Sequence, residues 1–227
     1  VSDVHGKEFG ADSAVLLAKT ARLAPDLIAI TGDLVHRRDQ LEMVPALAAG
    51  LSAIAPTYYV TGNHEWAAKL APEVKDLLEQ EGVTVLSNSF LPLEREGQRI
   101  VLAGVDDPNG PYDQKTPVQV SGEIKAAWGD VFTLLLAHRN DHCEAYDQAG
   151  FHLILSGHAH GGVVRLPFTD GLIGPNMRLF PSRTAGYYAL EQGQLVVSRG
   201  LGISAEPFRL FNRPHLPVVI LRAADSI

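Results

Sequence analysis

The sequence is poor in cysteine: Cys143 is the only one among 227 residues, so no disulfide bond can form within the chain. A lone cysteine behaves as a small apolar side chain, and we expect Cys143 to lie in the core. The sequence also lacks fixed-period repeats, low-complexity stretches and any change in composition that would mark a boundary. We therefore predict a single domain over residues 1–227.

Long apolar runs are absent as well. None reaches the roughly 18 to 20 residues that span a bilayer, and no signal-peptide pattern is present. The chain opens with Val1-Ser2-Asp3 rather than Met, which predicts the end of a strand whose earlier residues lie upstream. A leader or anchor could precede it, so the expected location is the cytoplasm or a membrane surface.

Basic residues are outnumbered, with 19 Lys and Arg against 26 Asp and Glu, for a formal net charge of −7. Proteins that grip a nucleic-acid backbone usually carry a basic face, so nucleic acid is not an expected partner. Some carboxylates could instead hold cations. For most of them, solubility is a sufficient explanation.

Compact apolar runs alternate with helical patterns through the first two-thirds of the chain. The runs predict buried strands, and apolar residues at helical spacing predict the helices between them. The expected strands cover residues 26–30, 57–60, 100–103, 132–136 and 152–155, and the expected helices cover residues 14–23, 41–53 and 73–81. Gly82 stands where the last of these helices should end.

The last third of the chain has a different pattern. Residues 187–190, 195–198 and 217–221 are strand-like with no helix between them, and residues 191–194 are typical of a hairpin turn. Residues 166–185 are rich in Gly and Pro and predict a long loop. Together these patterns predict an α/β fold with two sheets.

Polar motifs follow the predicted strands at the point where each strand stops. An apolar run ends, and Asp, Asn or His then appears next to Gly. The motifs are Asp3-Val4-His5-Gly6, Gly32-Asp33, Gly62-Asn63-His64-Glu65, His138-Arg139 and Gly157-His158-Ala159-His160-Gly161-Gly162.

These five motifs should meet at one edge, because ligands bind at the carboxyl ends of strands in open α/β sheets. Their Asp, Asn and His side chains supply two carboxylates, one amide and five imidazoles, without a thiolate, a donor set that suits Zn, Mn or Fe. A single Gly-Asp or Asp-x-His occurs often by chance in ordinary turns. Five such motifs in order, each after a strand, favour a metal site.

This series of motifs resembles the calcineurin-like metallophosphoesterase superfamily over nearly the whole chain. The resemblance implies a four-layer α/β/β/α sandwich of two mixed sheets flanked by helices. Residues 198–204, Arg213-Pro214, residues 104–108 and Gly161-Gly162 also resemble a bacterial, often membrane-associated branch. That branch includes pyrophosphohydrolases acting on UDP-diacylglucosamine-type lipid precursors.

The resemblance implies two divalent metal ions, Mn, Fe or Zn, and a role for each motif residue. By motif position, the first metal would be bound by Asp3, His5 and His160, and the second by Asn63, His138 and His158. Asp33 would bridge the two ions, and His64 would be the catalytic histidine.

The implied reaction is hydrolysis of a phosphodiester or pyrophosphate bond by attack of a metal-bridging hydroxide. The expected substrate is a phosphorylated small molecule or a lipid-nucleotide. Two alternatives stay open: a phosphomonoesterase acting on a small metabolite or phosphoprotein, and a metal-binding scaffold without catalysis. The presence of His64 argues against the scaffold, since a scaffold has no need of it.

Four further side chains are candidates for substrate contact. Arg139 stands beside a predicted ligand, and His36, Arg37 and Arg38 follow the Gly32-Asp33 turn, where a solvated loop is the alternative. In the long loop, residues 167–168 and 172–173 could form an apolar lip for a lipid substrate or pack on themselves. Such a lip would allow peripheral membrane association.

Overall fold

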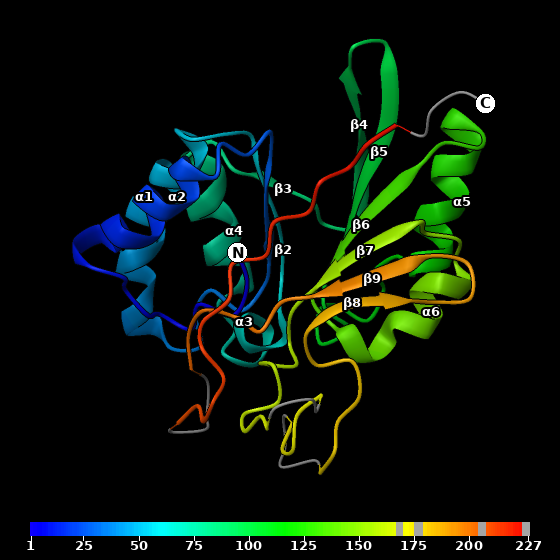
Figure 1. The fold of residues 1–227 in the computed structure, drawn as a ribbon. Coiled ribbons are helices and arrows are strands. Elements are labelled where there is room, and N and C mark those ends of the chain that lie inside the picture. Colours follow the sequence, from blue (N-terminus) through cyan, green and yellow to red (C-terminus); the bar gives the residue numbers. More distant parts are fainter. Residues whose placement is uncertain (167–169, 175–178, 204–207, 224–227) are drawn as a thin grey trace.

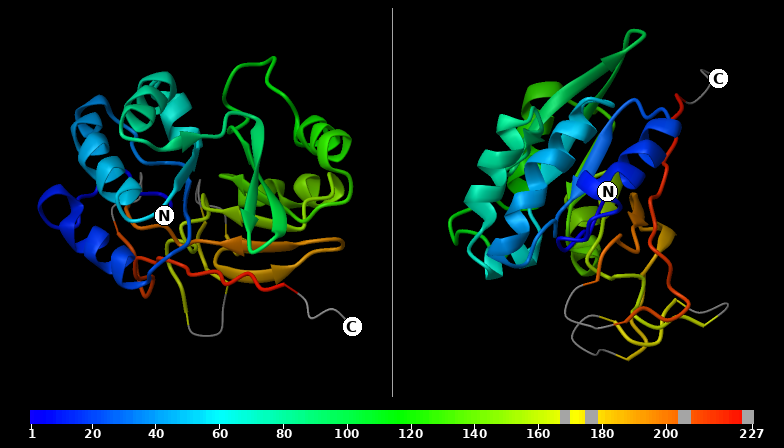
Figure 2. Two further views of the ribbon diagram at one scale, coloured as in Figure 1. Left: turned by 90° about the horizontal axis from the view of Figure 1, so that it is seen from above. Right: turned by 90° about the vertical axis from the view of Figure 1, so that its left-hand side faces the viewer.

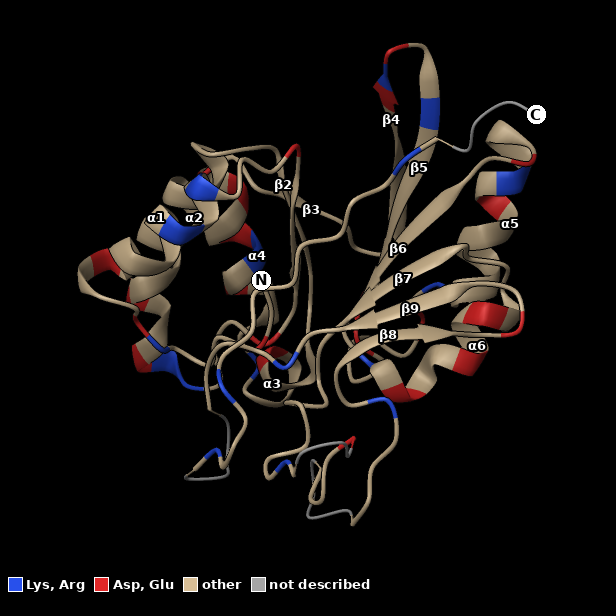
Figure 3. Ribbon diagram, viewed as in Figure 1, with Lys and Arg blue, Asp and Glu red and all other residues tan. Residues whose placement is uncertain are grey.

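The computed structural model describes residues 1–166, 170–174, 179–203 and 208–223. The chain forms four layers, in which two β-sheets lie face to face and helices cover the outer face of each sheet (Figures 1 and 2). This arrangement confirms the α/β/β/α sandwich expected from the sequence. Charged residues lie mainly on the outer helices and the loops (Figure 3).

The first sheet has three strands in the order β1-β2-β3. They are β1 (Ile28–Thr31), β2 (Thr57–Val60) and β3 (Thr84–Val85). Both pairings are parallel, with Ile28 opposite Thr57 and Tyr58 opposite Thr84. Val1 extends this ladder, since its carbonyl accepts the N–H of Thr31 at 3.0 Å.

The second sheet has six strands in the order β4-β5-β6-β7-β9-β8. They are β4 (Ser89–Arg95), β5 (Gln98–Val105), β6 (Thr133–Ala137), β7 (Leu153–Ser156), β8 (Gly186–Ala189) and β9 (Gln194–Val197). The pairs β4–β5 and β8–β9 are antiparallel and the others parallel. The mixed strand directions expected of both sheets are therefore found in this one, whereas the described strands of the first sheet all run parallel.

The helices lie on the outside of the sandwich. The α-helices are α1 (Ala14–Arg22), α2 (Val44–Ser52), α3 (Asn63–Ala67), α4 (Ala71–Gln80), α5 (Pro117–Trp128) and α6 (Cys143–Gln148). Short 3-10 turns are η1 (Ala11–Ser13), η2 (Arg38–Met43) and η3 (Asn140–His142). The helix expected over residues 41–53 is thus divided: its first turn belongs to η2, and α2 begins around Pro45, whose missing N–H suits a helix start.

The continuous apolar run of β6 is explained by burial on both of its faces. Leu134 and Leu136 pack into the core between the two sheets, whereas Leu135 packs toward α5 and α6. A strand covered on both sides reads as an unbroken hydrophobic run. Cys143 is fully buried in the helix-side core, as expected.

The C-terminal third departs from the prediction in one place. The hairpin of β8 and β9 is confirmed, but residues 217–221 form no ladder in the described part of the chain, so the predicted third strand is wrong. Val218 and Ile220 are 58% and 71% exposed. Pro214 and Pro217 lack backbone N–H donors, which disfavours sheet pairing of this segment.

The parallel strands determine where the loops meet. β1, β2, β6 and β7 all end toward the same edge of the sandwich, below the sheets in Figure 1. The segments before β8 and after β9 lie beneath that edge. Among the helices described, none has the length and apolar character needed to cross a membrane.

Candidate metal centre

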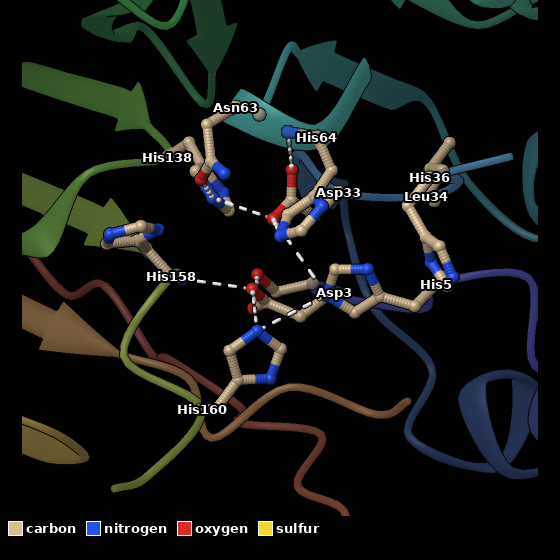
Figure 4. A network of polar contacts seen from close by, with 12 residues as sticks. Asp3, His5, Asp33, Leu34, His36, Asn63, His64, His138, His158 and His160 are labelled. Atoms are coloured by element: carbon tan, nitrogen blue, oxygen red, sulfur yellow. Dashed lines mark hydrogen bonds and ion pairs between the residues drawn. The ribbon is translucent and has the colours of Figure 1, made fainter. Parts of the chain in front are cut away.

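The five motifs meet at the sheet edge, as the sequence predicts (Figure 4). Two groups of side chains there could each hold a metal ion. One group comprises Asp3, His5, Asp33 and His160, and the other Asp33, His138 and His158. Asp33 is the residue that the two groups share.

The backbone is strained at these positions. Asp3, His5, Asp33, His158 and His160 all have positive φ, between 49° and 66°. Non-glycine residues rarely adopt this left-handed region, and such strain clusters at functional sites. It turns each side chain sharply away from its strand and toward the other loops.

The first group is compact and buried. Nε2 of His5 and Nε2 of His160 lie 3.2 Å apart, with the rings stacked. Asp3 Oδ1 is 3.5 Å from His160 Nε2, and Asp33 Oδ2 is 3.8 Å from His5 Nε2. Two imidazole nitrogens and two carboxylates therefore converge on one region.

The second group lies on the other side of Asp33. His138 Nε2 is 3.1 Å from Asp33 Oδ2 and 3.1 Å from the side-chain oxygen of Asn63. His158 stands beside His138, with ring centroids 5.1 Å apart. Asn63 thus brings an amide oxygen to this group, where the sequence expects it.

Second contacts orient these ligands. His138 Nδ1 lies 2.7 Å from the carbonyl oxygen of Thr31, the last residue of β1. This contact fixes the proton on Nδ1 and directs Nε2 toward Asp33, the arrangement found around metal-binding histidines. The N–H of His158 donates to Asp3 at 3.1 Å and ties the loop after β7 to the first motif.

Burial keeps most of the imidazoles neutral. It lowers the pKa of His158 to about 2 and lowers the pKa of His5 and of His160 below their ordinary values. Burial would also lower the pKa of His138, but the adjacent Asp33 carboxylate raises it to about 10. Neutral imidazoles are the form that binds metal, whereas His138 shares its proton with Asp33.

The donor set fits a pair of divalent cations. Asp33 Oδ2 is buried and receives no well-aligned hydrogen bond, although three imidazoles surround it. A buried carboxylate oxygen without a hydrogen-bond donor is costly unless a cation is bound there. Imidazole, carboxylate and amide donors match Zn, Mn or Fe.

Two glycines are required by the closeness of the loops. A methyl group at Gly62 would lie 2.1 Å from Asp33 Oδ1, and one at Gly157 would lie 2.4 Å from Asp3 Oδ2. Neither distance is compatible with a side chain. The glycine in each motif therefore makes room for a carboxylate from another loop.

Glu65 has a function that the sequence analysis missed. It is fully buried and accepts the N–H groups of Asp33 at 3.0 Å, Leu34 at 2.5 Å and Gly62 at 2.9 Å. Its carboxylate thereby joins the loop after β1 to the loop after β2. The only signal was its place in the Gly62-Asn63-His64-Glu65 motif, which says nothing about these partners.

His64 lies at the open side of the centre. Its side chain is 31% exposed, with Nε2 4.0 Å from Asp33 Oδ2, and its N–H donates to Asp33 Oδ1 at 2.9 Å. The ring meets that of His5 edge-on, with centroids 4.9 Å apart. This exposure leaves His64 accessible to a bound substrate. His36 lies further out, its ring 6.0 Å from that of His64.

Arg139 also reaches the centre. Its guanidinium forms an ion pair with the buried Asp107 at 2.7 Å, and Nη1 lies 3.2 Å from His158 Nε2. Asp107 belongs to the segment after β5, so a fifth strand end contributes to the site. Asp107 therefore holds the guanidinium of Arg139 in place before any substrate binds.

Arg37 and Arg38 are not brought to the centre. Arg37 pairs with Asp39 at 3.2 Å and Arg38 with Glu73 at 2.8 Å, both at the exposed surface. These contacts agree with the solvated loop considered as the alternative. Exposed pairs of this kind contribute little to stability.

Comparison with known proteins finds a matching family model and several relatives. The sequence model of the family described as calcineurin-like phosphoesterase matches residues 1–162. The chain is 28% identical to the uncharacterized metallophosphoesterase YkuE of Bacillus subtilis (strain 168), over 99% of this chain and 78% of that protein. It is also 28% identical to an uncharacterized metallophosphoesterase of Aquifex aeolicus (strain VF5), over 99% of this chain and 84% of the relative.

Some relatives are longer. The chain is 29% identical to a Bos taurus protein named transmembrane protein with metallophosphoesterase domain, covering 99% of this chain but 52% of that protein. Among solved structures, the phosphopantetheinyl hydrolase PptH from Mycobacterium tuberculosis superposes with a TM-score of 0.48 at 13% identity. That comparison covers 87% of this chain and 86% of the other.

Proposed function

The chain belongs to the calcineurin-like phosphoesterase family, and from this premise we propose that it hydrolyses a phosphodiester or pyrophosphate bond at a centre of two divalent metal ions. Its relatives indicate a metal-dependent phosphohydrolase. The observation that supports two ions is the pair of donor groups sharing Asp33. One ion would be held by Asp3, His5, Asp33 and His160, the other by Asp33, Asn63, His138 and His158.

The two ions would supply Lewis-acid charge for the phosphoryl oxygens and an activated water at neutral pH. The protein contributes orientation. Asp33, held by Glu65, carries charge to both positions, and the neutral His5, His158 and His160 need lose no proton to act as ligands. His64, on the open side, can donate a proton to the leaving oxygen or a hydrogen bond to the phosphoryl group.

Arg139 is the second group proposed to contact substrate. Its Nη1 faces the region between His158 and the open side, and Asp107 fixes its other two nitrogens. A planar guanidinium matches the geometry of phosphate oxygens. Asp107 therefore acts as a positioning residue, with Arg139 proposed to bind a non-bridging oxygen.

Peripheral membrane association is proposed from an apolar lip on the same side of the molecule. The lip consists of Leu166, Leu179, Phe180, Leu210 and Phe211, which are between 45% and 75% exposed. Bridges from residue 164 to residues 173 and 210, and from residue 173 to residue 179, hold these segments together. Of the sequence-predicted lip, residues 167–168 lie outside the described part, and Leu172 and Ile173 are partly buried.

The test of the proposed function begins with metal-stripped protein reloaded with Mn²⁺. Turnover of bis(4-nitrophenyl) phosphate and of 4-nitrophenyl phosphate is measured in parallel, with bound metal counted in the same samples. We expect diester hydrolysis that returns with about two ions per chain and is lost in Asp33→Asn.

Asp39→Asn is the matched control, because Asp39 is exposed and, among the residues described, forms an ion pair with Arg37 alone. It should retain full metal content and rate. Absence of bound metal in the wild type, or undiminished turnover in Asp33→Asn, would overturn the proposal. Turnover of the monoester alone would replace it with the phosphomonoesterase alternative.

A further inference from the structure

Three arginines beyond the matched family region gather beside the first metal position. Arg165, Arg199 and Arg209 are all partly buried and come from segments after the last motif. Figure 3 shows Lys and Arg residues in blue along the segments that lie beneath the sheet edge. A buried or half-buried arginine normally has an acidic partner, so the partners of these three are informative.

Arg209 lies against the loop of Asp3. Its guanidinium donates to the carbonyl oxygens of Arg199 at 2.6 Å and Gly200 at 3.2 Å. A methyl group placed at Gly200 would meet both Asp3 Cβ, at 2.6 Å, and Arg209 Nη2, at 3.2 Å. Arg209 is therefore anchored by backbone carbonyls right beside a candidate metal ligand.

Arg165 is anchored beside Gly161, the residue that follows His160. It donates to the carbonyl oxygens of Gly161 and Asp170 and to the hydroxyl of Thr184. The carboxylate of Asp170 accepts from Tyr188, Thr184 and the N–H of residue 183.

Arg199 lies between these two anchored arginines. Its aliphatic side-chain carbons pack on Gly161. A methyl group added at Gly161 would lie 2.8 Å from Cγ and 3.0 Å from Cδ of Arg199. Its guanidinium makes no hydrogen bond or ion pair with any residue that the structure describes. Arg199 is thus the one member of the group whose five N–H donors are uncommitted.

The electrostatic situation is unfavourable without an anion. Partial burial lowers the pKa of Arg199, and the charge of Arg165 lowers it further. Burial likewise lowers the pKa of Arg209. The charge of Asp3 raises this pKa, and the charge of Arg199 lowers it. Clustered guanidinium groups of this kind create a positive potential that attracts a negatively charged ligand.

We propose that Arg199, flanked by Arg165 and Arg209, binds a second phosphate group next to the one being hydrolysed, so that the enzyme prefers diphosphate diesters to simple phosphodiesters. This inference rests on the proposed function and narrows its substrate class. The fork of a guanidinium binds phosphate oxygens bidentately, and Arg199 stands beside His160, on the side of the first metal position.

The corresponding reaction balances with water alone. The oxygen of one water forms a bond to the phosphorus at the metal centre, and the bond from that phosphorus to the bridging oxygen breaks. The bridging oxygen leaves with the second phosphate, which Arg199 holds. The products are two phosphomonoesters. One hydrogen of the water stays on the attacked phosphate and the other goes to the leaving oxygen, and both groups then ionise according to the pH.

The kinetic test uses the Mn²⁺-loaded full chain with two probes, bis(4-nitrophenyl) phosphate and the diphosphate diester ADP-ribose. Arg199→Gln should lower kcat/KM for the diphosphate diester about tenfold or more and change that for the simple diester less than about twofold. Arg22→Gln is the control, since it removes one exposed positive charge on the outer helix α1. Arg22→Gln should leave kcat/KM unchanged for both probes.

A binding test is independent of catalysis. Methylenediphosphonate and inorganic phosphate are titrated into the metal-free chain by calorimetry, which avoids chelation of the metal by the ligand. Arg199→Gln should weaken the binding of methylenediphosphonate about tenfold and the binding of phosphate much less. Arg199→Lys should recover part of the lost affinity. An unchanged urea midpoint shows that the variant is folded.

The outcomes separate the two proposals. If neither probe is hydrolysed by wild type but Arg199→Gln still weakens diphosphonate selectively, the proposed function fails and the anion subsite stands. Equal losses for both probes, or no change in diphosphonate affinity, would overturn the subsite while leaving the phosphoesterase intact.

Discussion

Glu65 accepts the backbone N–H of Asp33 at 3.0 Å, so that a fully buried carboxylate holds the residue shared by both candidate metal groups. The same carboxylate accepts the N–H of Gly62, at the start of the loop that carries Asn63 and His64. The bridge between Asp33 and the loop of Asn63 and His64 is therefore made by a side chain that belongs to neither candidate metal group.

Replacing Glu65 by Ala should destabilise the protein and weaken metal binding together. Three buried N–H groups would lose their acceptor, at about 3 kcal/mol or more in total, and the Asp33 loop would lose its support. Urea unfolding and Mn²⁺ titration measure the two effects. Glu73→Ala, on an exposed glutamate paired with Arg38, should cost less than about 1 kcal/mol. Equal effects in the two variants would refute the bridging role.

Gly62 tests how closely the loops approach. Its φ is −105°, a value that alanine adopts without strain, so any loss in Gly62→Ala comes from contact alone. The new methyl group would overlap Asp33 Oδ1 at 2.1 Å, which should cost roughly 1–3 kcal/mol and displace the carboxylate. Thermal unfolding and metal content report both effects.

The matched control is Gly122→Ala in α5, where an added methyl group meets no atom within 4 Å. Alanine is the better helix former, so this variant should gain up to about 1 kcal/mol and keep its metals. A Gly62→Ala protein with normal metal content would show that the loops have room to separate.

The sequence predicted which motif residues come together, because its signals are local. Each ligand follows an apolar run directly, and parallel strand ends must meet at one edge, so Asp3, Asp33 and His160 could be grouped without coordinates. The hairpin of β8 and β9 was predictable for the same reason, from a short turn between two runs.

What the sequence did not predict depends on distant partners. Glu65 and Asp33 are 32 residues apart, and Arg38 reaches Glu73 across 35 residues, so neither partner could be named from the sequence. An apolar run also cannot report whether a neighbouring strand exists. Residues 217–221 have the composition of a strand, yet no described strand pairs with them.

Two missed elements did carry local signals. β4 pairs with β5 through a turn at Glu96 and Gly97, both with positive φ, and the Gly is the cue for such a hairpin. α5 begins with a capping box, in which the Thr116 hydroxyl accepts the N–H of Gln119. Both could have been found by closer attention to turn and cap residues.

Removal of the His64 imidazole should slow turnover without emptying the site. Its backbone N–H donates to Asp33, its Nε2 lies 4.0 Å from Asp33 Oδ2, and the side chain is absent from both metal groups. His64→Gln should therefore lower kcat about a hundredfold or more while bound Mn²⁺ stays constant. His142→Gln, on an exposed histidine, should leave both unchanged. Metal loss in His64→Gln would reassign the residue as a ligand.

The apolar lip predicts binding to lipid vesicles. Phe180 and Phe211 are 75% and 72% exposed, beside the arginines of the C-terminal segments. The double variant Phe180→Ser, Phe211→Ser should reduce co-sedimentation with phosphatidylglycerol vesicles at least about fivefold, since each buried aromatic ring contributes apolar area. Val15→Ser, at an exposed position of α1, is the control. Undiminished sedimentation of the double variant would exclude the lip as the contact.

Acid should destabilise the metal-free protein through its neutral histidines. Burial lowers the pKa of His158 to about 2 and lowers the pKa of His5 and His160, whereas unfolded histidines bind protons below about pH 6.5. The unfolded state then takes up more protons, so stability present above that pH is lost as the pH falls. Glu65 opposes this, because burial raises its pKa to about 8 and the folded state keeps its proton.

The contribution of His158 to the pH dependence of stability can be isolated by comparing wild type with His158→Gln. Between about pH 6 and 4, wild type should lose about 1.4 kcal/mol per pH unit more than His158→Gln, the value for one proton bound only on unfolding. Urea midpoints of chelator-treated protein at several pH values measure the two slopes. His142→Gln, which changes an exposed ring, should retain the wild-type slope. Parallel slopes for wild type and His158→Gln would mean that His158 already binds a proton in the folded metal-free state, and its place as a ready neutral ligand would have to be abandoned.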